Sequence, residues 1–503
     1  MTTIGTIIRL HSERQPDRPA VIATGRKSLS WRDLAIYINA VRIDLRNAGF
    51  GAEARIGVAL PSGPEAALAI VAIACSAIAV PFDLKLALPE IELRLKLLRL
   101  SAVVVHRGTP SAMRTAAERA RLLVIEAEVR DQERLEACLI VSKAEAAALP
   151  SEPKPDSPAF ILQTSGTTGQ PKLIPYSHGN MLATARRVQS WFTLTPDDRC
   201  LSATPIYYSH GLKVTVFTPL LSGGSTAFPS DSSTVDIDEW LGALQPTWFT
   251  AGPALHRFVM EKALERGDAR ELHRLRFVVS GGAPLPSQVQ CKLEAALGVP
   301  VLEHYGATEA AQISANLPPP GPAKVGTCGI PEKGILIITD EAGRELPQGQ
   351  EGEIWLRGPT LISGYLDAPE LNGASFAGEW FRTGDLGRLD EEGYLVLCGR
   401  KKELINRGGE KISPIEIDTA VLRHPDVIEA AAYSVPHPRL GEDVAADVVL
   451  RSGSTVTELE LREFLRSHLA LYKIPRRIRV VDRLPKGVTG KVQRRMLRGD
   501  ANV

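Results

Sequence analysis

The most informative stretch for the fold class is the run Ile161-Leu-Gln-Thr164-Ser165-Gly166-Thr167-Thr168-Gly169-Gln-Pro-Lys172. It begins as an apolar strand, continues as a turn of small residues and ends in a lysine. Glycine and hydroxyl residues let several backbone N–H groups converge on a phosphate oxygen, and the hydroxyls add further donors. The spacing does not match the G-x-x-x-x-G-K-[ST] phosphate loop, and a Gly/Ser/Thr turn by itself is usually an ordinary loop.

Outward from this stretch, short apolar runs alternate with helical patterns through most of the chain. This alternation predicts an α/β fold with mostly parallel sheets. An apolar run from Ala66 to Val80 is shorter than the ~20 residues that span a bilayer, so a buried helix leading into a strand is expected there. Ser30 is expected to cap a helix that begins at Trp31. The expected strands are Ala20–Ile22, Arg55–Leu60, Ala102–His106, Leu122–Ile125, Ala159–Thr164, Thr226–Phe228, Thr247–Ala251 and Arg276–Ser280.

The pattern changes twice in the last third of the chain. After about residue 320, short strands at Gly334–Thr339, Gly352–Arg357 and Gly393–Leu397 are separated by Gly, Pro and Asp turns and predict a small β-rich subdomain. Beyond Lys402 a compact α+β unit is expected. Its predicted elements are helices at Pro414–Arg423 and Thr457–Ala470 and strands at Ile428–Val435, Asp443–Leu450 and Ile478–Val481. A chain of 503 residues is too long for one core, so more than one domain is expected.

Composition excludes several classes of partner. The 59 Lys and Arg residues balance 58 Asp and Glu residues, so no global field favours a nucleic acid or a membrane. The six cysteines are scattered without a C-x-x-C pair, which argues against a zinc site or a disulfide framework and fits a reducing compartment. The N-terminus lacks a secretion signal, so a cytoplasmic location is expected.

The exact string from Thr164 to Lys172 resembles the phosphate loop of the adenylate-forming superfamily, which contains acyl-CoA synthetases, luciferases and peptide-synthetase adenylation domains. Further motifs follow in the superfamily's order. In Tyr305-Gly-Ala-Thr308-Glu309, the resemblance implies a Tyr ring on adenine, a Thr at the α-phosphate and a Glu on Mg²⁺. Taken alone, these would be ordinary surface residues. In Trp380-Phe-Arg-Thr-Gly-Asp385, the Asp would accept protons from the ribose hydroxyls, and Arg400 would be a second ribose contact.

Near the C-terminus, Gly490-Lys491 resembles the segment that carries the superfamily's catalytic lysine. A lone lysine in a basic tail is normally solvated. Here an anionic carboxylate must approach an anionic α-phosphate, and an ammonium between them offsets that repulsion in the transition state. The resemblance also implies ATP and Mg²⁺ as cofactors, with Glu309 and Thr168 as metal contacts and Mg²⁺ assisting the departure of pyrophosphate.

The run Gly399-Arg-Lys-Lys402-Glu-Leu-Ile-Asn-Arg-Gly408-Gly409-Glu-Lys411 is typical of the acyl-CoA synthetase branch and is similar to the oxalate–CoA ligase group. The resemblance implies an ATP- and acid-binding domain over 1–399, a hinge at 400–402 around Lys402, and a C-terminal domain over 403–503. Gly408 and Gly409 would lie beside a tunnel for coenzyme A, and Lys411 would contact its phosphate. Without the resemblance, two successive glycines indicate only a turn.

By the same resemblance, six residues are expected to border the acid pocket. They are Tyr207, Tyr208, His210, Ser280, Gly281 and His304. Two of them, Tyr208 and His304, depart from the commonest pattern of the superfamily, whereas the Ser280-Gly281 segment follows the general family more closely than the oxalate group. Tyr208 stands where His is usual, and His304 stands where Gly or Ala is frequent. A desolvated imidazole at the pocket floor opposes binding of a long alkyl chain and can donate to a distal carboxylate or hydroxyl. The predicted substrate is therefore a small polar or dicarboxylic, oxalate-like acid or an aromatic acid. Packing against backbone carbonyls is the alternative role for both histidines.

The expected activity is ATP-dependent acid–CoA ligation through acyl-AMP, by a monomer or homodimer. A luciferase lacks support in the sequence. A nucleotide sensor with a dead site is disfavoured, because both Lys491 and Glu309 are present. No carrier domain is expected, since twelve residues follow Lys491. A stand-alone acyl-AMP ligase that serves a separate carrier protein remains the alternative.

Overall fold

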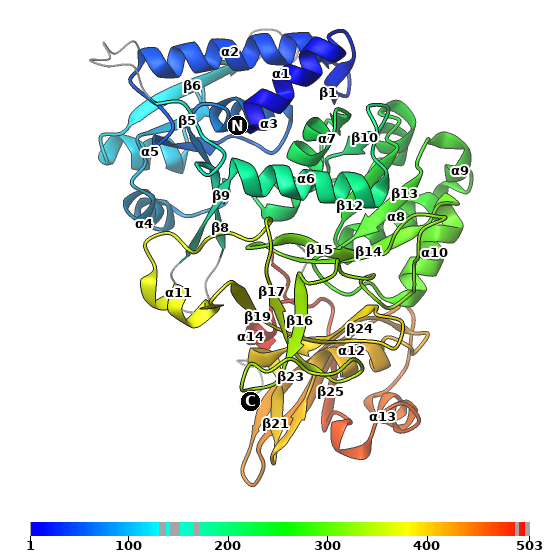
Figure 1. The fold of residues 1–503 in the computed structure, drawn as a ribbon. Helices are drawn as coiled ribbons and strands as arrows, with labels where there is room; N and C mark the ends of the chain where they lie inside the picture. Colours follow the sequence, from blue (N-terminus) through cyan, green and yellow to red (C-terminus); the bar gives the residue numbers. More distant parts are fainter. Residues whose placement is uncertain (1, 130–136, 141–150, 165–170, 488–491, 498–503) are drawn as a thin grey trace.

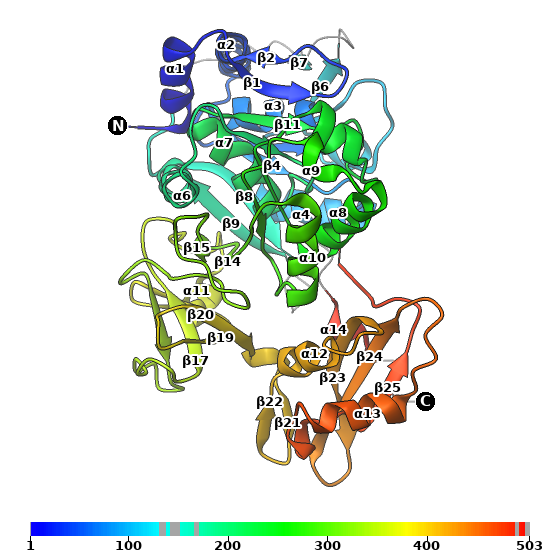
Figure 2. The same ribbon diagram turned by 90° about the vertical axis from the view of Figure 1, so that its right-hand side faces the viewer.

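The structure is a computed structural model, and it describes residues 2–129, 137–140, 151–164, 171–487 and 492–497. The large region consists of two main sheets with helices around and between them (Figure 1). Below them lie a small β sheet and a C-terminal α+β unit (Figures 1 and 2). No helix in the described ranges is long and apolar enough to cross a membrane.

One main sheet has eight strands in the order β15-β14-β13-β12-β10-β11-β1-β2. Neighbours are parallel except at its two ends, where β14 pairs with β15 and β1 with β2 antiparallel. The strands are β1 Pro19–Ala23, β2 Leu29–Ser30, β10 Arg199–Leu201, β11 Ser225–Phe228, β12 Trp248–Ala251, β13 Phe277–Ser280, β14 Val301–Ala307 and β15 Ala311–Ala315.

The other main sheet has seven strands in the order β7-β6-β5-β3-β4-β8-β9, again parallel except at the edges. Its strands are β3 Arg55–Ala59, β4 Ile78–Pro81, β5 Ala102–His106, β6 Leu123–Val129, β7 Ala137–Ile140, β8 Pro158–Thr164 and β9 Lys172–Ser177. Parallel strands buried on both faces read as continuous apolar runs, which is why the sequence located so many of them.

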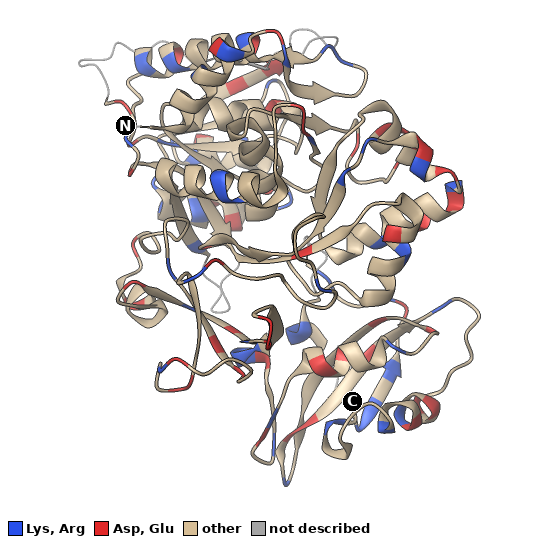
Figure 3. Cartoon of the chain, turned by 45° about the vertical axis from the view of Figure 1, so that its right-hand side comes forward, with Lys and Arg blue, Asp and Glu red and all other residues tan. Residues whose placement is uncertain are grey.

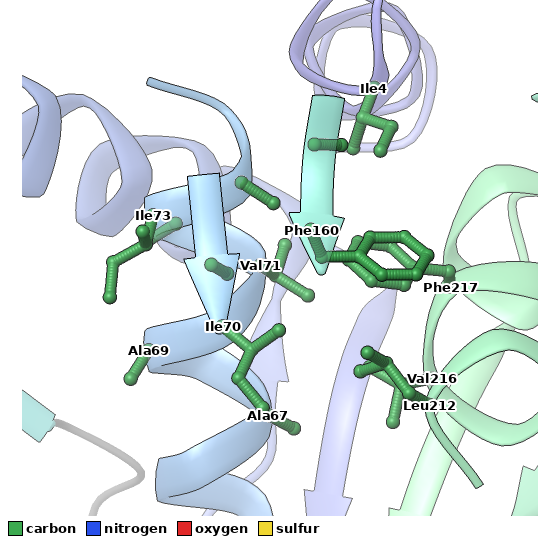
Figure 4. Close-up of a cluster of buried hydrophobic side chains, with 14 of the residues drawn as sticks. Ile4, Ala67, Ala69, Ile70, Val71, Ile73, Phe160, Leu212, Val216 and Phe217 are labelled. Carbon is green, nitrogen blue, oxygen red and sulfur yellow. The ribbon is translucent and has the colours of Figure 1, made fainter. Parts of the chain in front are cut away.

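Helix α3 (Pro64–Ala74) lies between the two main sheets and contacts both β1 and β3. All but one of its residues are buried, so it lacks a polar face. Ile70 and Val71 pack in the same cluster as Phe160 of β8 and Phe217, whose rings are stacked with centroids 5.2 Å apart (Figure 4). The expectation of a buried helix leading into a strand at Ala66–Val80 is confirmed.

The remaining helices of the large region cover the outer faces of the sheets or connect their strands. They are α1 Ile4–Arg14, α2 Trp31–Asn47, α4 Leu88–Leu98, α5 Ala112–Arg119, α6 His178–Phe192, α7 Thr218–Leu221, α8 Pro253–Arg266, α9 Ala269–Leu272 and α10 Ser287–Leu297, with π-helical segments at Gly211–Phe217 and Asp238–Ala243. Ser30 caps α2 as expected, because its side chain accepts from the Asp33 backbone N–H.

The small β sheet contains β16 Leu336–Thr339, β17 Gly352–Leu356, β18 Phe376–Ala377, β19 Trp380–Leu389 and β20 Leu395–Arg400, with α11 (Pro369–Ser375) before β18. The expected strand Gly393–Leu397 was placed too early. Gly393 belongs to a turn, with φ of +87° and a hydrogen bond to Asp390. The strand begins at Leu395 and continues to Arg400, so Arg400 lies opposite Asp385 in the sheet.

The C-terminal unit has its own five-stranded sheet of β21 Ile405–Arg407, β22 Glu410–Ile412, β23 Val427–His437, β24 Gly441–Leu450 and β25 Arg477–Val480. Its helices are α12 Pro414–Val421, α13 Glu458–Arg466 and α14 Arg494–Leu497, with 3₁₀ turns at Lys401–Glu403 and Leu471–Lys473. Helix α13 ends four residues earlier than predicted. The side chains of Ser467 and His468 both bond the Phe464 carbonyl and so compete with continued helix.

Basic and acidic side chains are interspersed on the elements seen in Figure 3. This distribution is consistent with the near-zero net charge of the sequence.

Candidate active site

Tyr305, Asp385 and Arg400 form one side of the site. Tyr305 ends the buried part of β14, and its hydroxyl donates to Asp385 Oδ2 at 2.8 Å. Arg400 lies directly across from Asp385 in the β19–β20 pair, with its Nε 2.7 Å from Asp385 Oδ1. This pairing exists because β20 extends to residue 400. Burial, followed by the charge of Asp385, raises the pKa of Tyr305 well above its usual value, so the phenol stays a donor.

The Asp385 carboxylate is therefore oriented by one donor on each oxygen. A carboxylate can accept about four hydrogen bonds, so acceptor capacity remains for a ligand hydroxyl pair. The structure brings these three predicted residues together from three different strands.

Lys172 and Glu309 lie on another side of the site, joined through Tyr365. Lys172 opens β9 opposite Thr164, the last residue of β8. Its Nζ lies 3.3 Å from the Tyr365 hydroxyl, which in turn donates to Glu309 Oε1 at 2.6 Å. Ser165, Gly166, Thr167, Thr168 and Gly169 lie outside the described residues.

Lys213 supports the same region from inside the core. Its side chain is fully buried in the π-helical segment Gly211–Phe217, and Nζ donates to the Thr308 carbonyl at 2.9 Å. The ammonium also lies 4.2 Å from the centre of the Tyr176 ring, a cation–π distance. Burial lowers the pKa of Lys213 to about 7, against the opposing effect of Glu309.

Tyr365 and Lys213 were not among the predicted site residues. A lone tyrosine gives no local signal. Lys213 did give one, because it is the single charge within the apolar run Leu212–Phe217. Such a residue is either exposed at a break in the pattern or buried with dedicated partners, and here it is buried.

The half-buried His210, just before the π-helical segment Gly211–Phe217, and the buried His304, in the middle of β14, lie beside each other. Their ring centroids are 5.4 Å apart, and His210 Nε2 lies 2.7 Å from Thr250 Oγ1. Both ring nitrogens of His304 are buried without a hydrogen-bond partner among the described residues, as is Ser280 Oγ. A Cβ on Gly281 would lie 2.0 Å from His304 Nε2, so the glycine is what allows this ring position.

Burial depresses the basicity of both histidines. It lowers the pKa of His210 to about 3, with a further contribution from His304, and the pKa of His304 to about 4. Both rings are therefore neutral near pH 7 and can each donate one N–H and accept at the other nitrogen. A buried polar group without a partner is rare and costly, and a ligand group is one way to satisfy it.

Tyr207 and Tyr208 are packed on each other, with ring centroids 4.5 Å apart. Burial raises the pKa of both phenols, to about 12 for Tyr208, so both remain neutral. They lie on the same segment as His210, before the π-helical turn.

The residues predicted for coenzyme A are not brought to this site. Gly408 and Gly409 form the turn of the β21–β22 hairpin, at the end of the C-terminal unit opposite the main sheets (Figure 1). Their φ angles of +60° and +100° require glycine whatever they contact. Lys411 pairs with Glu341 at 2.5 Å. Lys402 lies in the 3₁₀ turn between the last two sheets, and Lys491 lies outside the described residues.

A metal ion held only by protein is not supported in the described ranges, which contain no cluster of three or more His, Cys, Asp or Glu ligands. One carboxylate at Glu309 suits Mg²⁺, which usually takes one or two carboxylates and completes its shell with nucleotide phosphates and waters.

Comparison with known proteins identifies the family. A family model described as "AMP-binding enzyme" matches residues 8–366, and one described as "AMP-binding enzyme C-terminal domain" matches residues 416–491. The chain belongs to the AMP-binding enzyme family. The predicted membership of the adenylate-forming superfamily is thereby confirmed.

Two relatives of this AMP-binding enzyme are informative. It is 38% identical to the oxalate–CoA ligase of Arabidopsis thaliana, over 68% of this chain and 67% of the relative. It is 34% identical to the sulfoacetate–CoA ligase of Cupriavidus necator, over 98% of this chain and 96% of the relative. The predicted class, an AMP-forming acyl-CoA synthetase that uses ATP and coenzyme A, is confirmed.

A solved structure extends the likeness to the whole chain. The ATP-bound structure of MatB from Rhodopseudomonas palustris superposes with a TM-score of 0.87 at 28% identity, covering 99% of both chains. The apo structure of the same protein gives a TM-score of 0.79. This AMP-binding enzyme is therefore arranged more like the ATP-bound form than the apo form.

Proposed function

We propose that this AMP-binding enzyme joins a small carboxylic acid with a second anionic or strongly polar group to coenzyme A. The acid would first react with ATP to give acyl-AMP and pyrophosphate, and the thiol of coenzyme A would then displace AMP. The observation that supports this substrate class is the His210–His304 pair, in which both ring nitrogens of the buried His304 lack a hydrogen-bond partner in the described part of the chain.

An apolar acid would leave those imidazole nitrogens unsatisfied, whereas a second carboxylate or sulfonate accepts from their N–H groups. A site built to hydrogen-bond a ligand group rejects an analogue lacking that group by about 10⁴-fold or more in favourable cases. The two curated relatives act on oxalate and sulfoacetate, which are two-carbon acids with a second anionic group. This agreement favours the same class here, ahead of a compact aromatic acid.

The nucleotide roles follow from the predicted motifs. Tyr305 would pack on adenine, while Asp385 and Arg400 hold the ribose hydroxyls. Thr308 would meet the α-phosphate, and Thr164 to Gly169 with Lys172 would cradle the other phosphates. Mg²⁺ would be held by Glu309, with Thr168 nearby, and would neutralise phosphate charge when bound. The buried side chains of Lys213 and Tyr365 would hold Thr308 and Glu309 in fixed positions beside the phosphates.

Domain roles complete the proposal. Residues 1–399 would bind ATP and the acid, and residues 403–503 would supply Lys491 for the first half-reaction. Rotation about 400–402 would then bring Gly408, Gly409 and Lys411 towards the acyl-AMP, which explains why they lie away from the site in an arrangement resembling an ATP-bound form. In either arrangement the C-terminal unit would cover the acyl-AMP and protect its reactive anhydride from water.

The test is a panel of acids in isosteric pairs, scored by pyrophosphate release and by acyl-CoA formed. Oxalate is matched with 2-methylpropanoate, malonate with 3-methylbutanoate and sulfoacetate with 3,3-dimethylbutanoate, and benzoate and dodecanoate are added. The proposal expects the anionic member of at least one pair to be preferred. Preference for dodecanoate would contradict it, and acyl-AMP that free coenzyme A cannot discharge would indicate a carrier-protein ligase instead.

A further inference from the structure

The described residues on either side of Lys491 form two arms that pair with each other. Lys486 and Val492 form an antiparallel bridge, and the Gln493 N–H donates to the Pro485 carbonyl at 2.8 Å. Lys491 is the residue before Val492 in the chain, so the contacts that fix these two arms bear on its proposed role.

The second arm is fixed within the C-terminal unit. Arg494 donates to the Ala432 carbonyl of β23 at 2.7 Å and to Asp418 of α12 at 2.5 Å. Its side chain is 15% exposed and that of Asp418 is 13% exposed, so this pair is well shielded from solvent. These contacts attach the arm to its own unit and leave its position relative to ATP open.

The first arm is tied to the large region through one carboxylate. Lys486 Nζ lies 2.6 Å from Glu429 Oε1 of β23. The same oxygen lies 3.4 Å from Arg257 Nη1 of α8, and Arg257 Nη2 donates to the Ile428 carbonyl. Arg257 is 20% exposed and Glu429 is 21% exposed, so solvent screens these charges less than those of a surface pair.

These contacts cross the proposed hinge. Arg257 precedes residues 400–402, whereas Glu429 and Lys486 follow them, so rotation of the C-terminal unit must break the Arg257 contacts. The lysine-to-glutamate contact lies within the rotating unit and can persist. The network is thus specific to the present arrangement, which resembles the ATP-bound MatB structure more than the apo one.

We propose that Arg257, Glu429 and Lys486 are positioning residues for acyl-AMP formation, which dock the first of the two arms onto helix α8. The proposal rests on the two half-reactions of the proposed function. None of the three needs to touch substrate. Their role is to stabilise the arrangement in which Lys491 can reach the acid and the α-phosphate, and the Arg257 contacts are broken in the arrangement used for thioester formation.

The matched control lies on the same helix. Arg266 of α8 forms ion pairs with Asp238 and Asp268, all within the large region. Arg266→Met removes the same kind of side chain and ion pair without touching the C-terminal unit. It should leave both half-reactions unchanged.

The experiment measures the two half-reactions separately in Arg257→Met, Glu429→Gln and their double variant. Acyl-AMP formation is followed in single turnover, and thioester formation is followed from supplied acyl-AMP and coenzyme A. The first rate should fall about three- to tenfold in each single variant, with the double variant no worse than the larger single effect, because the two residues share one interaction. The second rate should be unchanged or faster. Equal losses in both half-reactions, or no loss in the first, would overturn the proposal.

A readout independent of the acid separates this proposal from the proposed function. Trypsin cleavage at Lys401 and Lys402 in the presence of ATP reports the arrangement of the two units. Cleavage should be faster in Arg257→Met than in Arg266→Met and the wild type. Equal cleavage in all three would count against the docking role even if no acid in the panel proved to be a substrate. A wild type that releases pyrophosphate supports the proposed function whatever the variants do.

Discussion

The hydroxyl of Tyr365 donates to Glu309 Oε1 at 2.6 Å and lies 3.3 Å from Lys172 Nζ. It thus connects the lysine that follows the phosphate loop with the carboxylate proposed to hold Mg²⁺. Burial, together with the charge of Glu309, raises the pKa of Tyr365 well above its usual value, so it remains a donor to the carboxylate at any pH at which the enzyme works.

Tyr365→Phe should slow acyl-AMP formation by about tenfold and raise the Mg²⁺ concentration needed for half-maximal rate. A hydrogen bond to a charged group contributes roughly 1.5–3 kcal/mol, and its loss frees the carboxylate to rotate. The rate of pyrophosphate release against Mg²⁺ concentration provides the measurement. Tyr472→Phe, at an exposed tyrosine of the C-terminal unit, is the control. An unchanged Mg²⁺ dependence would show that Tyr365 has only a packing role.

Lys213→Met should also impair acyl-AMP formation, although it removes no group proposed to touch ATP. The variant leaves the Thr308 carbonyl without its 2.9 Å donor and loosens the Thr308–Glu309 turn. Global stability should change little, because the cost of the lost hydrogen bond is offset by relief of a buried charge. Thermal unfolding and single-turnover pyrophosphate release are the two measurements, with exposed Lys262→Met as control. Full activity in Lys213→Met would contradict this role.

Gly281→Ala should displace the His304 ring, because the new Cβ would lie 2.0 Å from Nε2. The expected result is a loss of kcat/KM for the preferred acid that exceeds any loss in ATP affinity. Gly373→Ala is a suitable control, since a Cβ there meets nothing within 4 Å. If both variants kept the same acid preference as the wild type, His304 would not border the acid pocket.

Stability should fall as pH drops below about 6.5, partly through the buried histidines. The folded protein holds the pKa of His304 at about 4, below its ordinary value of 6.5, so the unfolded chain binds more protons between these values. The contribution is fully present above pH 6.5 and is lost as the pH falls towards 4, on the order of 1–3 kcal/mol. His304→Gln should flatten the dependence of the urea midpoint on pH between 7 and 5, whereas His106→Gln, at an exposed site, should not. Parallel curves for the wild type and both variants would show that the lowered pKa of His304 does not contribute to the pH dependence of stability.

Much of the fold was predictable because parallel strands are continuous apolar runs bounded by turns, as at Ala102–His106. The nucleotide motifs were found for a related reason, since each is a short contiguous string. Two kinds of feature escaped this approach. Tyr365 and Lys213 act across long sequence separations, and only the folded chain brings them to Glu309 and Thr308. The predicted strand Gly393–Leu397 missed the turn at Gly393 and ended three residues before Arg400, the residue that pairs with Asp385.

The same limit applies to the proposed acid pocket. The sequence indicated His210 and His304 as neighbours of the acid, but it left open whether backbone carbonyls satisfied them. The structure gives different answers for the two rings. His210 has Thr250 as a partner, whereas His304 has none in the described part of the chain.

The most direct test of the central claim is the ratio of kcat/KM for malonate and its apolar isostere 3-methylbutanoate, compared between the wild type and His304→Leu. The two acids have the same number of heavy atoms and similar shapes, and they differ in the second carboxylate that His210 and His304 are proposed to bind. The account predicts a wild-type ratio of roughly a hundred or more in favour of malonate, which falls towards one in the variant. A wild-type ratio at or below one, or a ratio that the substitution leaves unchanged, would contradict it.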